Sequence, residues 1–114
     1  MKNILLVAMM LIGFNTMAQD YQKAKFQVWG NCEMCQTKIV KVAKAVEGVR
    51  KANWNIATQQ MLVKFDTETT SLEIIQKAIA DAGYDNEGFR ADDEVYKNLH
   101  YCCKYDRPEP LKEE

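Results

Sequence analysis

The order in which hydrophobic periodicity changes along the chain is the feature that most constrains its fold. Apolar and polar residues alternate with a period of two in three segments, and such alternation is typical of strands that bury one face. These segments are residues 24–29, 50–56 and 61–65. The short stretch 57–59 between the last two is compatible with a hairpin, so those strands are expected to pair antiparallel.

Two other segments follow a helical period. The first, at about 35–46, places apolar residues at i, i+3, i+4 and i+7 from Ile39, and the second carries a similar stripe over 72–82. A weak strand is expected over 87–91. The resulting order of strand, helix, strand, strand, helix and strand predicts an α+β fold, a ferredoxin-like βαββαβ sandwich. Its antiparallel four-strand sheet would carry both helices on one face.

The N-terminal segment 1–18 has the pattern of a secretory signal peptide. Lys2 provides a positive charge, an apolar run covers 4–14, and the small residues Thr16 and Ala18 suit a cleavage site. We therefore expect a periplasmic or secreted protein after cleavage, with a short linker at 19–22. Such compartments allow disulfides to form and persist.

Charge and motif content exclude several function classes. The chain has 15 Lys and Arg against 16 Asp and Glu, a net charge of -1, which argues against a nucleic-acid partner. It has a single His and no HExxH, GxSxG or phosphate-loop motif, which removes most hydrolases and NTPases. The sequence therefore favours a protein that is not an enzyme.

A C-x-x-C pair formed by Cys32 and Cys35 carries the chemistry. The pair follows a predicted strand and enters a predicted helix, so both sulfurs are expected to converge on one ion. The unpaired N–H groups of a helix N-terminus favour thiolates and lower the pKa of cysteine. Thiolates are soft ligands that prefer Cu(I) and, by the same softness, Hg(II), whereas a structural zinc site needs four protein ligands. The same motif alone also fits a redox dithiol or a short-loop disulfide.

In this context the segment resembles the heavy-metal-associated domain of copper chaperones, metal-pumping ATPases and periplasmic mercury-binding proteins. The resemblance covers 23–91 and includes the turns Glu47-Gly48-Val49 and Ala82-Gly83-Tyr84-Asp85. It implies that Cys32 and Cys35 are the metal ligands and that Tyr84 lies beside the metal. The loop departs from the family pattern, because Trp29-Gly30-Asn31 replaces Gly-Met-Thr before the first cysteine.

The function expected from these residues and this resemblance is soft-metal binding and transfer by ligand exchange. Cu(I) is the expected ion, and Hg(II) or another soft metal is the alternative. The expected partner is a metal-transporting membrane protein or another metal acceptor. A thiol-disulfide redox module is the alternative from a different function class.

The segment 92–114 is expected to be a C-terminal extension with a second thiol pair, Cys102 and Cys103, preceded by His100. Three interpretations remain open. Cys102 or Cys103 folds back as an additional ligand of the first site, or the extension forms its own soft-metal site with His100. In the third, the two cysteines form a disulfide with each other or between chains, or pack inertly.

Overall fold

The computed structural model describes residues 21–108 of the chain, and the predicted signal peptide lies outside them. The described residues contain three strands, three α-helices and a short 3-10 helix. In chain order these are β1 (Tyr21–Gln27), α2 (Glu33–Ala45), β2 (Val49–Trp54), β3 (Gln60–Asp66), α3 (Leu72–Asp81), α4 (Asp93–Lys97) and η2 (Tyr101–Cys103). The three sequence segments with period two and the two with helical period are therefore confirmed as strands and helices, with small shifts at their ends.

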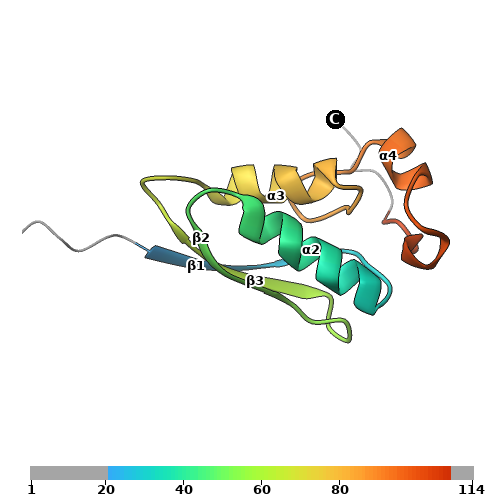
Figure 1. Ribbon diagram of the computed structural model, residues 1–114, viewed down its shortest axis with the longest axis horizontal. Coiled ribbons are helices and arrows are strands. Elements are labelled where there is room, and N and C mark those ends of the chain that lie inside the picture. The colour runs from blue at the N-terminus through green and yellow to red at the C-terminus, as the bar shows by residue number, and fades with distance from the viewer. Residues whose placement is uncertain (1–20, 109–114) are drawn as a thin grey trace, which may run out of the picture.

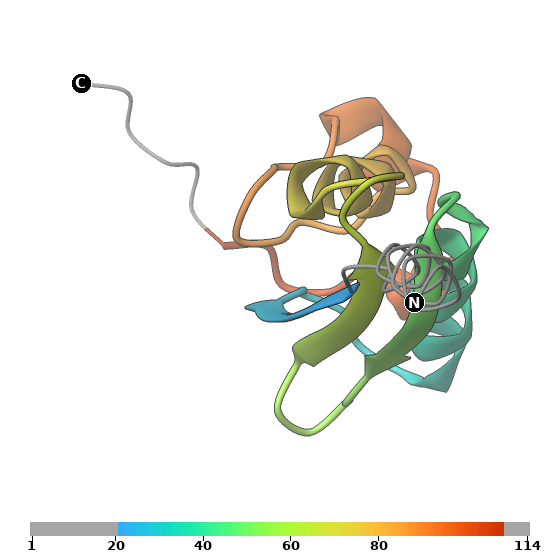
Figure 2. The same cartoon turned by 90° about the vertical axis from the view of Figure 1, so that its left-hand side faces the viewer.

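The sheet is antiparallel, with β3 between β1 and β2 (Figure 2). Phe26 of β1 and Trp54 of β2 both face Met61 of β3. Helices α2 and α3 lie on the same face of this sheet (Figure 1). The fold is therefore a two-layer α+β arrangement, as the sequence predicts.

The core lies between the helices and the sheet, because the alternating strands and the helix stripes supply apolar side chains from both layers. Its buried members include Phe26, Val28, Ile39, Ala43, Trp54, Met61, Val63, Phe65, Ile75 and Ile79. Two glycines end the turns that follow the helices. Gly48 and Gly83 have φ values of 97° and 110°, a region in which a side chain is strained.

The sheet of the described residues has three strands and not the predicted four. An isolated antiparallel bridge between Val28 and Asn86 stands where the fourth strand was expected. Pairing stops there because the Asn86 Oδ1 accepts hydrogen bonds from the N–H groups of Gly88 and Phe89, at 3.0 and 3.1 Å. This Asn turn redirects the chain, so the prediction of a strand over 87–91 was wrong.

After this turn the chain continues through α4 and η2, and η2 contacts α2. In Figure 1 the orange and red end of the described chain lies next to the N-terminal end of α2. Leu99, Cys103 and Tyr105 of this segment are buried in the same core as the strands. The extension is thus an integral part of the folded unit. Within residues 21–108, no helix has the length and apolar character needed to cross a bilayer.

Candidate metal centre

Cys32 and Cys35 meet at the N-terminus of α2. Cys32 occupies the N-cap position without a capping hydrogen bond from its side chain, and Cys35 lies in the first turn of the helix. Their Sγ atoms are 3.8 Å apart, and both cysteines are free thiols. Cys35 is fully buried, whereas Cys32 is half-buried. The two-residue spacing therefore brings the sulfurs together as the sequence predicts.

The loop before Cys32 is fixed by Trp54. The indole Nε1 of Trp54 donates a hydrogen bond of 3.0 Å to the carbonyl of Val28. A Cβ atom on Gly30 would lie 2.8 Å from Cη2 of the same ring, so only glycine fits beside it. The fully buried Trp54 thus explains why Gly30 stands in the loop where the family pattern has a methionine.

The C-terminal extension brings its cysteines to this site. Cys102 Sγ lies 3.9 Å from Cys32 Sγ. The sulfurs of Cys32, Cys102 and Cys103 all lie within 4.8 Å of one another. The Asn31 side chain holds this arrangement from the loop by donating a hydrogen bond of 3.0 Å to the Cys102 carbonyl. The extension therefore folds back onto the loop of the first cysteine pair.

Two further side chains stand at the exposed edge of the cysteine cluster. Met34 Sδ is 3.7 Å from Cys102 Sγ, and His100 Nδ1 is 3.2 Å from the same sulfur. The group of three possible ligands whose atoms lie within 4.8 Å of one another consists of Cys32, Cys102 and Cys103 and does not include His100.

Tyr84 forms the inner wall of the cluster. Its side chain is fully buried, and its hydroxyl has no hydrogen-bond partner among residues 21–108. Burial raises the pKa of Tyr84 far above its usual range, and the neighbouring thiols of Cys35 and Cys103 raise it further. The hydroxyl therefore lies beside the sulfurs of Cys35 and Cys103.

The four thiols differ in acidity. The backbone N–H of Cys35 lowers the pKa of Cys32, as expected at a helix N-terminus. Burial raises the pKa of Cys35 to about 11 and also raises the pKa values of Cys102 and Cys103. The expectation of lowered pKa values therefore holds for Cys32 but is wrong for Cys35, because desolvation of the buried sulfur outweighs the helix terminus.

A hydrogen-bond network, which we call the latch, fastens the extension to the domain. The Tyr105 hydroxyl accepts from the Asp85 N–H at 2.7 Å and donates to the Gly83 carbonyl at 2.8 Å. Arg107 binds both carboxylate oxygens of Asp85, at 2.8 and 2.9 Å. Its Nη2 also donates to the Ala91 carbonyl at 2.6 Å. Sequence analysis missed the latch, because no local pattern connects Asp85 with residues twenty positions further on.

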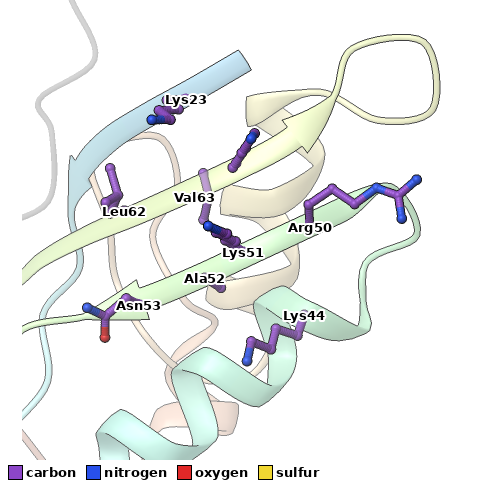
Figure 3. A pocket seen from close by; sticks show the side chains of 9 residues that line it. Lys23, Lys44, Arg50, Lys51, Ala52, Asn53, Leu62 and Val63 are labelled. Carbon is purple, nitrogen blue, oxygen red and sulfur yellow. The ribbon is translucent and has the colours of Figure 1, made fainter. Parts of the chain in front are cut away.

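A second concave feature lies on the open face of the sheet, away from the cysteines (Figure 3). Its lining is dominated by basic side chains from the sheet and α2. These are Lys23, Lys44, Arg50, Lys51 and Lys64. The pocket contains neither a sulfur ligand nor an acidic group, so it does not suit a metal cation.

Comparison with known proteins identifies the family of the chain. The family model of the heavy-metal-associated domain matches residues 31–85. The chain is also 36% identical to oxidized MerP from Ralstonia metallidurans CH34, covering 96% of that chain and 60% of its own, with a TM-score of 0.57. The chain belongs to the heavy-metal-associated domain family. This is a family of metal-binding modules and not of enzymes, which confirms the non-enzymatic expectation.

Other members of the family handle different metals. The periplasmic component of a mercuric transport protein from Pseudomonas aeruginosa is 42% identical over 53 residues, which cover 46% of this chain and 58% of that protein. A copper-exporting P-type ATPase from Staphylococcus epidermidis is 38% identical over 56 residues, 49% of this chain and 7% of the ATPase. The CopZ metallochaperone structure has a TM-score of 0.55 at 26% identity, covering 98% of its chain and 57% of this one.

The similarity to these relatives covers only part of this chain. The chain spans only part of the curated relatives, from a small fraction of the ATPase to somewhat over half of the mercuric protein. The family match includes Cys32, Cys35 and Tyr84 and ends at residue 85. Cys102, Cys103 and the arginine of the latch lie beyond it.

Proposed function

We propose that this heavy-metal-associated domain binds a soft metal ion through Cys32 and Cys35 and transfers it to an acceptor. The observation that carries the proposal is the pair of free sulfurs 3.8 Å apart at the start of α2, inside the family match. The ion is cargo and not a resident cofactor. Tyr84 closes the inner side of the site, in the position that the family resemblance implies.

Cu(I) is the proposed native cargo, and Hg(II) is the alternative. Both ions are soft and favour thiolates over oxygen ligands. The family relatives include both a copper-exporting ATPase and a mercuric transport protein, which supports the class of ion and leaves the choice to experiment.

Transfer proceeds by ligand exchange without a change in oxidation state. An acceptor thiol loses its proton and bonds to the ion, while one metal–cysteine bond breaks and the released thiolate takes up a proton. The half-buried Cys32 is the first bond to exchange, since the acceptor cannot approach the fully buried Cys35. The acceptor is a metal-transporting membrane protein or another thiol-bearing metal carrier. With residues 1–18 as a signal peptide, this exchange takes place in the periplasm or outside the cell.

Titration of the reduced protein with Cu(I), in competition with a chromophoric chelator, tests the proposal. One ion per chain is expected. The variant Cys32→Ser, Cys35→Ser should lose tight binding while its thermal unfolding remains cooperative. Tight binding by this double variant would overturn the proposal, and the same titration with Hg(II) ranks the two ions.

The redox alternative rests on the lowered pKa of Cys32 next to a second free thiol. A thioredoxin-like dithiol is faced by a proline, yet the prolines of this chain are Pro108 and Pro110, far beyond the cysteine loop. An insulin reduction assay on the metal-free protein separates the two functions. Turnover comparable to that of a disulfide reductase would favour the redox function.

A further inference from the structure

We propose that Cys102 and Cys103 bind the same ion as Cys32 and Cys35, so that the extension completes the site with sulfur ligands and covers the cargo. This inference rests on the proposed function and adds the identity of the remaining ligands. It also predicts that an acceptor must displace the extension before it receives the metal.

The separation of the first two sulfurs leaves room for more ligands. With metal–sulfur bonds of about 2.3 Å, two ligands in a linear site lie roughly 4.6 Å apart, whereas trigonal and tetrahedral sites need about 4.0 and 3.8 Å. The Cys32 sulfur lies 3.8 Å from that of Cys35 and 3.9 Å from that of Cys102. Both distances suit a site with three or four sulfur ligands better than a linear one.

Cys103 belongs to the same cluster from the buried side. Its sulfur lies within 4.8 Å of those of Cys32 and Cys102, and its side chain is 2% exposed. The four sulfurs therefore form an inner pair, Cys35 and Cys103, and an outer pair, Cys32 and Cys102. The sulfurs of Cys32, Cys102 and Cys103 all lie within 4.8 Å of one another, and Cys35 adjoins this set through its 3.8 Å contact with Cys32. The ligands would come from two segments about seventy residues apart.

The extension is held in place by contacts that do not involve its thiols. Asn31 binds the Cys102 carbonyl from the loop. Tyr105 and Arg107 of the latch follow Cys103 along the chain, and both bind Asp85. The arginine is 13% exposed and the aspartate 1%, so solvent screens this pair only weakly. The second thiol pair is thus positioned before any ion binds.

X-ray absorption of the full chain loaded with one equivalent of Cu(I) is the primary test. Three or four sulfur neighbours are expected, and the variant Cys102→Ser, Cys103→Ser should show two. The affinity of the same variant for Cu(I) should fall by about tenfold or more, equal to ~1.4 kcal/mol. The variant Lys104→Ala changes an exposed side chain of the same segment, is the matched control, and should retain the neighbours and affinity of the wild type.

The outcomes separate this inference from the proposed function. Two sulfur neighbours in the wild-type chain would overturn the inference and leave the C-x-x-C site in place. This measurement needs no variant, so it holds even if the Cys102→Ser, Cys103→Ser variant fails to fold. Unchanged affinity and coordination in a folded Cys102→Ser, Cys103→Ser variant would also overturn it. Loss of binding in the Cys32→Ser, Cys35→Ser variant, together with wild-type affinity and coordination in the Cys102→Ser, Cys103→Ser variant, would support the proposed function while denying a role to the extension.

Discussion

Arg107 Nε lies 2.8 Å from the Oδ2 of Asp85, and this ion pair joins the C-terminal extension to the loop after α3. Asp85 follows directly after Tyr84, which lines the cysteine cluster. The latch and the candidate metal centre are therefore adjacent along the chain as well as in space.

Replacing Arg107 with Leu should destabilise the fold. The substitution leaves the Asp85 carboxylate buried without its counter-ion, and breaking a buried pair in this way costs about 3–5 kcal/mol. Urea denaturation followed by circular dichroism measures the free energy of unfolding. The matched control is Lys77→Leu, which breaks the exposed pair between Lys77 and Asp81, and it should change stability by no more than about 1 kcal/mol. Equal losses in the two variants would contradict a stabilising role for the latch.

The contribution of Asp85 to the stability of the fold should decrease as the pH falls. Burial alone would raise the pKa of Asp85, but hydrogen bonds from Arg107 and from the Ala91 N–H lower it below the ordinary carboxyl value of 3.8. A carboxyl group whose pKa is lowered by folding stabilises the native state above its unfolded pKa and loses that effect as the pH falls through its folded pKa.

The wild type should therefore exceed the variant Asp85→Asn in unfolding free energy at pH 7, and the difference should shrink below the ordinary value of 3.8. Urea denaturation of both proteins at a series of acidic pH values measures this difference in unfolding free energy. If the difference grew on acidification, the predicted direction of the pH dependence would be wrong.

The thiols of the metal-free protein should react in a fixed order. Cys32 is half-buried and its pKa is lowered, whereas Cys35 is fully buried with a pKa raised to about 11. Because the thiolate is the nucleophile, iodoacetamide at pH 7 should modify Cys32 well before Cys35. Tandem mass spectrometry of the labelled peptide assigns each site, and labelling in denaturant should abolish the preference. Faster labelling of Cys35 would contradict the assigned environments.

Three lysines lie in register on the open face of the sheet. Lys64 on β3 is paired with Lys23 on β1 and with Lys51 on β2, and like charges directly opposite one another are destabilising. Lys64→Glu should therefore raise the free energy of unfolding by about 0.5–1 kcal/mol at low salt. Added salt should reduce the gain, since these side chains line the open pocket in Figure 3. Lys64→Gln removes the charge alone and should give a smaller gain. A destabilised glutamate variant would contradict the repulsion argument.

The regular elements could be predicted because their causes are local. Alternation in the strands and the stripe around Ile39 depend on residues a few positions apart, and the structure confirms them. The predicted strand at 87–91 was wrong for an equally local reason, since Asn86 accepts two backbone hydrogen bonds and turns the chain. That turn could have been suspected from Asn86-Glu87-Gly88, because Asn and Gly are typical turn residues.

The sequence by itself determined the two-layer architecture and the convergence of Cys32 and Cys35. Two intervening residues at the start of a helix bring both sulfurs to the same end of that helix. Only the tertiary structure decided where the second cysteine pair lies and which thiols are buried. The placement of Cys102 depends on Asn31 and on the latch at Asp85, contacts between residues far apart along the chain. The raised pKa of Cys35 likewise depends on burial by other segments. Such contacts have no periodicity or spacing in the sequence, because they are stabilised only once the whole chain has packed.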